Sequence, residues 1–344
     1  MLSFLNSKKP VSAEINGRAI SVSPKETLLQ AALRQGVEIP YSCRVGGCAT
    51  CKCKLLKGRV KELTEASYIL SDEELDQGYI LACQSVPQTD VRIEVDLSRV
   101  AARRTVGARI VEQARLTHDI TRLRLRLDDS LAYKAGQFAE LSVAALPGVS
   151  RNYSFATAPR LDSQLEFLVR KVPGGRFSTL INEQNLVGQS AQVVGPLGDF
   201  WLRPAEAPLL LVAGGSGLAP ILAMLEDAAS NGVSRSVSLL FGARQPRDLY
   251  ALDEIEALRR QWQGRFRFIP VLSEAGGDAT WEGERGLVTE KIAGVLEAGS
   301  HAYLCGPPGM IDSAVALLMQ LGVTREHIHA DRFTTLRDSL AAAA

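Results

Sequence analysis

The stretch Pro40-Tyr41-Ser42-Cys43-Arg44-Val45-Gly46-Gly47-Cys48-Ala49-Thr50-Cys51 holds three of the chain's six cysteines, and Leu81-Ala82-Cys83-Gln84 adds a fourth. A Cys-x4-Cys-x2-Cys loop with one distant cysteine is the ligand spacing of a plant-type 2Fe-2S cluster. Three ligands share one loop because the loop must wrap the cluster. Gly46 and Gly47 let the backbone approach and direct amides at the sulfurs, which helps tune the reduction potential. The expected ligands are Cys43, Cys48, Cys51 and Cys83.

Zinc is the alternative occupant of such a loop. Zinc sites usually combine two Cys-x2-Cys pairs, and only Cys48 and Cys51 have that spacing here. A disulfide framework does not suit a chain of this length without a secretory signal, so metal-binding cysteines in a reducing cytoplasm are expected. Cys53 lies further along the strand expected to start near Cys51, away from the loop, and we interpret it as a plain thiol.

A small mixed sheet with one helix packed across it is expected around this loop, in a domain of residues 1–98. Strands 13–15 and 18–22 flank Asn16-Gly17, a pair typical of a type I′ hairpin turn. Further strands are expected over 52–60 and 91–95.

A helix is expected over residues 27–35, with Gly36 as its stop. The apolar face of that helix is expected to consist of Leu28, Leu29, Ala32 and Leu33.

After a linker expected at 99–105, the rest of the chain shows two further sequence patterns, one over 106–203 and one over 204–344. Residues 106–203 carry short strands punctuated by glycine and proline, and over 121–127 every second residue is an arginine, between threonine or leucine residues. This pattern predicts an antiparallel β-barrel. Residues 204–344 alternate apolar strands with helices, which predicts a doubly wound α/β domain.

The composition is that of an ordinary soluble globular protein, with 344 residues, 46% hydrophobic, 22% charged and a net charge of +1. The balanced charge disfavours nucleic-acid and membrane-surface roles, which usually need a basic excess. The uncharged run 207–225 is interrupted by Gly214-Gly215-Ser216-Gly217 and Pro220, so a strand, a turn and a helix explain it better than a membrane span. Residues 1–6 have no signal-peptide pattern. We expect a cytoplasmic monomer.

A candidate flavin site follows Gly136-Gln137-Phe138 at Arg151-Asn152-Tyr153-Ser154. Arginine can bind a pyrophosphate, tyrosine can cover a ring face, and a serine hydroxyl can bond a ring nitrogen. Leu168-Val169-Arg170 adds a second charge, and Gly174-Gly175-Arg176-Phe177-Ser178 offers a glycine turn with amides for phosphate. An ordinary strand end explains the first tetrapeptide equally well when it is taken alone.

A candidate nicotinamide site lies at Val212-Ala213-Gly214-Gly215-Ser216-Gly217-Leu218-Ala219-Pro220, after a buried strand and at the start of a helix. Glycine amides at a helix N-terminus favour a pyrophosphate, and proline is tolerated in a first helical turn. Phe241-Gly242-Ala243-Arg244 ends a later strand, where the adenosine half of the dinucleotide is expected.

These motifs, in this order and over nearly the whole chain, resemble the reductase components of multicomponent bacterial oxygenases. In that family a plant-type ferredoxin is fused to a ferredoxin–NADP reductase-like module. The resemblance implies electron flow from NADH through FAD and the cluster to an oxygenase component, directly or through a separate ferredoxin. FAD rather than FMN is implied because the cluster domain is N-terminal. NADPH stays open, since Arg244 and Arg247 could meet a 2′-phosphate.

The resemblance also implies roles in the flavin site. Arg151, Tyr153 and Ser154 would contact the flavin, with Ser154 near N5. The pyrophosphate would lie near the segment Arg176-Phe177-Ser178.

Two C-terminal motifs resemble the family pattern at the nicotinamide. Leu304-Cys305-Gly306-Pro307-Pro308-Gly309-Met310 places Cys305 beside the nicotinamide C4, with a packed core cysteine as the alternative. Asp331-Arg332-Phe333 places Phe333 over the flavin face that the nicotinamide must occupy, with an aromatic packed on the domain surface as the alternative. Ser154 and Asp331 would tune the flavin and the nicotinamide geometry.

Three hypotheses concern the function of the chain, and the first two differ in the electron acceptor. In the first, the acceptor is an oxygenase, with either a Rieske or a diiron centre. In the second, it is a radical deoxysugar dehydratase, whose reductases share this domain order. The third makes the chain a binding module with a zinc-filled cysteine knot and no electron transfer. Residues 1–98 carry balanced charge, whereas free plant ferredoxins are strongly acidic, and this suits a tethered module that needs no long-range steering.

Overall fold

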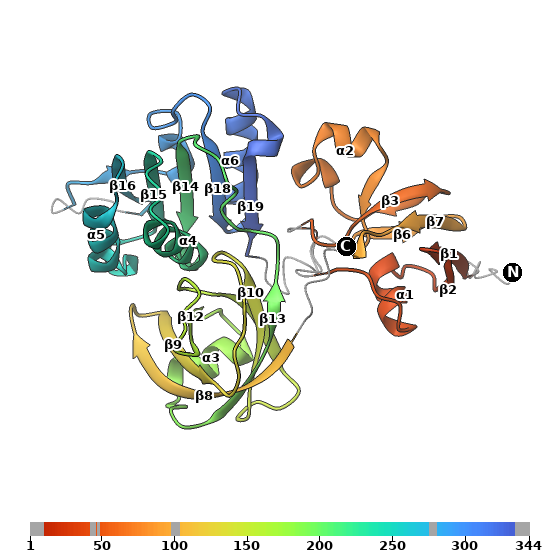
Figure 1. The fold of residues 1–344 in the computed structure, drawn as a ribbon, viewed down its shortest axis with the longest axis horizontal. Helices are drawn as coiled ribbons and strands as arrows, with labels where there is room; N and C mark the ends of the chain where they lie inside the picture. The colour runs from red at the N-terminus through yellow and green to blue at the C-terminus, as the bar shows by residue number, and fades with distance from the viewer. Residues whose placement is uncertain (1–9, 42–45, 47–48, 98–103, 275–280, 334–344) are drawn as a thin grey trace, which may run out of the picture. The chain divides into compact units, whose positions relative to one another are not determined.

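The computed structural model describes residues 10–41, 46, 49–97, 104–274 and 281–333 (Figure 1). These residues fall into two compact units, one up to residue 97 and one from residue 104 onward. Strand β8 begins at Arg104, so Arg104 and Thr105 are strand and not linker as expected. Linker residues 99–103 lie outside the described residues, and the other domain limits stay a prediction.

In the described part of the first unit, a sheet has the strand order β2-β1-β7-β3-β5. Strands β1 (Val11–Ile15) and β2 (Arg18–Val22) pair in antiparallel register, with Ile15 opposite Arg18. The two-residue turn between them has positive φ at both positions, 46° at Asn16 and 85° at Gly17. The expected type I′ hairpin is therefore confirmed.

Helix α1 (Leu28–Arg34) begins at a capping box, in which Thr27 and Gln30 bond each other's backbone amides. Gly36 follows the helix with a φ of 64°, as expected of a helix stop. The expectation for Leu33 is wrong, because its exposed fraction is 40% and Ala31 is buried instead. Leu33 lies five residues after Leu28, which turns it about 140° around the helix axis.

The single strand expected over 52–60 is also wrong. It is two strands, β3 (Lys52–Lys57) and β4 (Val60–Glu62), separated by Gly58 at a φ of 93°. A Cβ on Gly58 would lie 2.2 Å from the Asp90 carbonyl oxygen, so the chain turns there. The remaining elements of this unit are α2 (Asp72–Asp76), β5 (Tyr79–Leu81), β6 (Ser85–Pro87) and β7 (Val91–Glu94).

The N-terminal half of the second unit is the expected antiparallel barrel, with strand order β11-β10-β13-β8-β9-β12 in its described residues (Figure 1). A bridge between Phe155 and Phe167 joins the two edges of this sheet and closes it. Helix α3 (Arg176–Glu183), which the sequence did not lead us to expect, contributes Phe177 to the barrel core. The strands are β8 (Arg104–Arg115), β9 (Ile120–Leu127), β10 (Phe138–Val143), β11 (Ser150–Ser154), β12 (Gln164–Arg170) and β13 (Ser190–Leu197).

The C-terminal half is a parallel sheet with strand order β17-β16-β15-β14-β18-β19 in its described residues. Alternate residues of β14 enter two cores: Leu209 and Leu211 pack with α4, and Leu210 and Val212 pack with α6. Helices therefore cover both faces, which confirms the doubly wound fold. The elements are β14 (Leu209–Gly214), α4 (Leu218–Ser230), β15 (Val237–Ala243), α5 (Leu252–Gln261), β16 (Phe266–Leu272), β17 (Glu284–Arg285), β18 (His301–Gly306), α6 (Pro308–Gln320) and β19 (Ile328–Arg332). Among the described residues, no helix is long and apolar enough to cross a membrane.

A chain of alternating charges ties the barrel to the α/β domain. It starts at Glu226 on α4, which bonds Arg160 at 2.9 Å and the Ala158 amide at 2.8 Å. It ends where Arg122 approaches Glu254 on α5 at 3.8 Å. The members, in order, are Glu226, Arg160, Glu166, Arg124, Glu112, Arg122 and Glu254.

Candidate functional site

Two of the expected cluster ligands, Cys51 and Cys83, lie together in the first unit. Cys51 directly precedes β3, and Cys83 lies in the turn between β5 and β6. The Ala82 amide donates to the Cys51 carbonyl at 3.0 Å, and the Cys83 amide donates to Cys51 Sγ at 3.4 Å. Both cysteines are buried. Backbone N–H groups that donate to cysteine sulfurs stabilise the thiolates of an iron–sulfur cluster. Cys51 and Cys83 therefore fit the role of cluster ligands.

The other expected ligands, Cys43 and Cys48, lie outside the described residues, but Gly46 between them is described. Gly46 has a φ of 75°, and a Cβ there would lie 2.8 Å from Gln84 Cγ and 2.8 Å from Thr64 Oγ1. Both the backbone conformation and the lack of space require glycine at this position.

Cys53 lies on β3 opposite Ile80, and its side chain belongs to the hydrophobic core of the unit. Burial, and then the neighbouring Cys83, raise the pKa of the Cys53 thiol to about 12. A protonated core thiol agrees with the interpretation of Cys53 as a plain thiol.

Strands β10 and β11 bring the first flavin motif together. Phe138 pairs with Ser154, and Leu141 pairs with Arg151. Arg151 and Asn152 are exposed, whereas Ser154 is buried. Strand β11 thus presents charged, aromatic and hydroxyl groups along one short segment at the barrel edge.

Helix α3 brings the second flavin motif to the first. The rings of Phe177 on α3 and Tyr153 on β11 lie 5.7 Å apart between centroids. Phe177 is 1% exposed, and the Ser178 hydroxyl accepts from the Val172 amide at 3.0 Å. These two side chains therefore build the turn, and a phosphate there would meet the backbone amides of the first helical turn and the Arg176 guanidinium.

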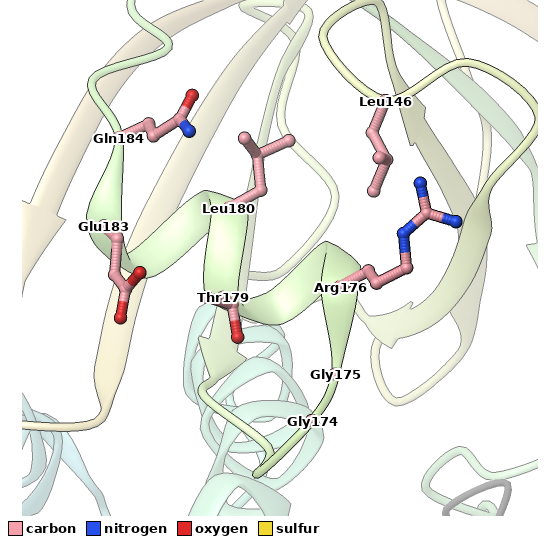
Figure 2. Close-up of a pocket in the computed structure, with 8 residues that line it drawn as sticks. All are labelled: Leu146, Gly174, Gly175, Arg176, Thr179, Leu180, Glu183 and Gln184. Atoms are coloured by element: carbon pink, nitrogen blue, oxygen red, sulfur yellow. The ribbon is translucent and has the colours of Figure 1, made fainter.

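A pocket of about 390 Å³ lies beside α3. Figure 2 shows Arg176 and Leu146 toward one end of its lining, with Glu183 and Gln184 toward the other. Gly174 and Gly175 also line it, so the pocket meets the expected pyrophosphate turn. Its volume lies within the range usual for ligand sites, about 300–1,000 Å³.

The glycine turn and the Cys-Gly motif pack directly against each other. Strands β14 and β18 are neighbours, with Ala213 opposite Cys305. A Cβ on Gly217 would lie 2.2 Å from the Cys305 carbonyl oxygen, and one on Gly214 would lie 2.6 Å from Met310 Sδ. Leu218 and Pro220 are buried in the first turn of α4, Ser216 is partly exposed, and Pro307 is an exposed cap before α6.

The motif Asp331-Arg332-Phe333 lies beside the Cys-Gly motif, at the carboxyl end of β18. Asp331 on β19 pairs with Cys305, and the Phe333 amide donates to the Gly306 carbonyl at 2.9 Å. Cys305 is 0% exposed and lies in the core, with a thiol pKa raised well above its ordinary value by burial and then by Asp331. Phe333 packs on that core while partly exposed. Cys305, Gly306, Asp331 and Phe333, all expected at the nicotinamide, therefore lie together, with Cys305 itself fully buried.

Arg170 links the barrel to the glycine turn. Its Nε donates to Asp119 Oδ2 at 2.9 Å, and its Nη1 lies 3.1 Å from where a Cβ of Gly215 would sit. The hydroxyl of Tyr250, whose pKa burial raises, donates to the Gly215 carbonyl at 2.9 Å. The expected role of Arg170 at the flavin stays a prediction; the structure shows that its side chain extends from β12 to the glycine turn. Its neighbours Leu168 and Val169 on β12 are core residues.

Asp119 and Asp248 lie beside the candidate site residue Arg244, and the sequence analysis did not single them out. Arg244, directly after β15, lies 3.8 Å from Asp119 and 3.6 Å from Asp248. Burial alone would raise the pKa of Asp119, but the hydrogen bond and charge of Arg170 hold it below its ordinary value. His118 completes a compact group with both carboxylates. Two guanidinium groups beside Asp119 make the group unfavourable for a metal cation.

Gly242 lies on β15, two residues before Arg244. A Cβ there would lie 3.0 Å from Val288 Cβ, so the end of β15 also packs closely.

Models of three protein families match the chain. They are the 2Fe-2S iron-sulfur cluster binding domain over residues 13–88, the oxidoreductase FAD-binding domain over 107–201 and the oxidoreductase NAD-binding domain over 211–316. These matches confirm the expected cluster, FAD and nicotinamide cofactors, and they make the chain an oxidoreductase.

Relatives cover nearly the whole chain. The xylene/toluene monooxygenase electron transfer component of Pseudomonas putida is 44% identical, over 94% of this chain and 93% of its own length. The phenol 2-monooxygenase reductase component of Pseudomonas sp. strain CF600 is 36% identical, over 95% of both chains. The solved structure of the Amycolatopsis cytochrome P450 reductase GcoB is 34% identical, with a TM-score of 0.70 over 94% of this chain and 99% of that one. The chain belongs to the family of electron-transfer reductase components of oxygenases.

Proposed function

We propose that this chain oxidises NADH and supplies electrons to an oxygenase component that acts on an aromatic compound. The observation that carries the proposal is the contact between Gly217 and Cys305, joined from the barrel side by Arg170. This packing supports one site, shared by the flavin barrel and the nicotinamide domain, in which a hydride passes from the nicotinamide to the flavin. FAD, when bound, supplies the conversion between the two-electron chemistry of nicotinamide and the one-electron chemistry of the cluster.

In this proposal the described side chains bind and orient rather than exchange protons. The first-turn amides of α3 and Arg176 hold the flavin pyrophosphate, and Arg151 and Tyr153 contact the flavin. Ser154 provides a buried hydroxyl near N5. Four groups at the carboxyl edge of the α/β sheet position the nicotinamide: Cys305, Gly306, Asp331 and Phe333.

We propose NADH rather than NADPH as the preferred cofactor. Arg244 directly follows the strand end at which the adenosine half is expected, and two carboxylates, Asp119 and Asp248, already lie beside it. Both carboxylates would repel a 2′-phosphate and compete with it for the guanidinium. A kcat/KM comparison between NADH and NADPH, with a dye as acceptor, tests this preference.

Two of the relatives named above serve a xylene/toluene monooxygenase and a phenol 2-monooxygenase, which supports an aromatic hydroxylating partner for this chain. The test is to supply the candidate oxygenase component with NADH and this protein and to measure product formed per NADH consumed. Coupled product formation supports the proposal, and NADH oxidation that never yields product with any aromatic-oxygenase component contradicts it.

The order of electron flow is tested with Cys48→Ser. The purified wild-type chain should show flavin and iron–sulfur absorption bands, and the variant should lose only the latter. We expect the variant to keep NADH-driven reduction of a two-electron dye and to lose electron delivery to the oxygenase. Loss of dye reduction as well would refute the linear order.

A further inference from the structure

Gln84 directly follows the ligand Cys83 and is fixed in place by the backbone. Its side chain is buried, with 8% of the residue exposed. The backbone N–H of Gln84 donates to the Leu81 carbonyl at 2.9 Å. The backbone carbonyl of Gln84 accepts from the backbone N–H of Leu63 at 2.8 Å. The position of the Gln84 Cα beside Cys83 is therefore set by bonds to two separate segments.

The Gln84 carboxamide is directed back at Cys83. Its Nε2 donates to the Cys83 carbonyl at 3.0 Å and to Cys83 Sγ at 3.6 Å. A carbonyl oxygen only accepts, so the carboxamide atom that faces Cys83 must be the NH2 group. The two N–H bonds of this group serve the carbonyl and the sulfur together.

The same side chain lies against the other part of the ligand set. A Cβ on Gly46, within the Cys43–Cys48 loop, would lie 2.8 Å from Gln84 Cγ. Gln84 therefore contacts the loop that carries the early ligands and donates to the late ligand.

We propose that Gln84 is a positioning residue that raises the reduction potential of the cluster through an N–H···S bond to Cys83. The one-electron reduction of the cluster adds negative charge that the ligand sulfurs share. A donor at the sulfur stabilises this reduced form more than the oxidised form, so the potential rises. The proposal rests on the cluster site of the proposed function and names a residue outside its four cysteines.

The test is a redox titration of the cluster in the full-length protein, followed by electron paramagnetic resonance of the reduced form. Gln84→Leu removes the donor, and Gln84→Glu keeps the shape while replacing the NH2 group by an acceptor. In both variants we expect the ratio of reduced to oxidised cluster at a fixed ambient potential to fall about tenfold, a shift of about 59 mV for one electron.

The matched control is Ser85→Ala in the next position. Ser85 is fully buried, and its hydroxyl donates to the Leu81 carbonyl at 2.9 Å, not to a cysteine sulfur. Its titration should match that of the wild type.

Unchanged titrations in both Gln84 variants would overturn the proposal. Failure of both to assemble a cluster would overturn it too, because Gln84 would then serve assembly and not the potential. A wild-type protein without iron–sulfur bands would instead refute the proposed function, so the two failures are distinguishable.

Discussion

Two glycines of the nicotinamide motifs, Gly217 and Gly309, are expected to respond differently to substitution by alanine, because only one of them has space for a side chain. Gly217 has a φ of −62°, which any residue can adopt, so only space forbids a side chain there. The new Cβ would lie 2.2 Å from the Cys305 carbonyl oxygen and 2.9 Å from the Gly306 nitrogen. Gly309, in the first turn of α6, has nothing within 4 Å of its Cβ position.

The cost of Gly217→Ala follows from what must move. The contact has to widen from 2.2 Å to an ordinary 3.4 Å, and the obstacle is backbone that cannot rotate away. Overpacking of this kind costs about 1–3 kcal/mol or more. A displacement on the order of 1 Å within a site that aligns two reactants costs about 100-fold in rate. Gly309→Ala should be neutral, or stabilise by about 0.4–1 kcal/mol, because alanine restricts the unfolded chain.

The assay is NADH-driven dye reduction together with the Tm of each variant. We expect kcat/KM for NADH to fall about 100-fold in Gly217→Ala and to stay at the wild-type value in Gly309→Ala. The reasoning fails if Gly217→Ala keeps both the wild-type Tm and the wild-type kcat/KM, because the packing of the two motifs would then not position the nicotinamide.

Three further perturbations test other parts of the site. Asp248→Asn should remove one of the two carboxylates beside Arg244 and raise the NADPH to NADH ratio of kcat/KM about tenfold, or about 1.4 kcal/mol; an unchanged ratio would refute the role given to the carboxylate. Cys305 should resist iodoacetamide at pH 8 in the native protein, as peptide mass spectrometry would show, because burial keeps the thiol protonated. Because its pKa is raised on folding, the contribution of this thiol to stability is complete below about pH 8.5 and is lost as the pH rises. The variant Cys305→Ala should therefore show a smaller alkaline decline in unfolding free energy than the wild type. Glu226→Gln should lower the unfolding free energy by about 1 kcal/mol at low salt and by less at high salt; a difference independent of salt would argue against an electrostatic link.

Local chemistry made much of this molecule predictable. Asn16-Gly17 favours positive φ at two successive residues, and that preference alone determines the hairpin. The cysteine spacing and the glycine turn after the buried run at 209–212 are similarly local signals, because one loop or one strand–helix turn carries each of them.

The missed residues depend on strand register. Asp119 meets Arg170 because β9 pairs with β12 with Ile120 opposite Arg170, and no local pattern specifies that pairing. Arg244 meets Asp119 only because the barrel and the α/β domain pack together. Gly58 lies inside the expected strand because one reason for glycine there, the close approach of the distant Asp90 carbonyl, is not visible in the local sequence.

The charge chain from Glu226 to Glu254 bears on how such reductases can be recombined. Only its two ends cross between the domains, where Arg160 of the barrel pairs with Glu226 on α4 and Arg122 of the barrel approaches Glu254 on α5. A chimera that takes the barrel from one relative and the nucleotide domain from another must match the sign of the charges at these two contacts. A chimera joined within residues 98–103 keeps all of these charged residues in one parent sequence. Exchange of whole iron–sulfur modules there is therefore the more permissive route to a reductase with a new electron acceptor.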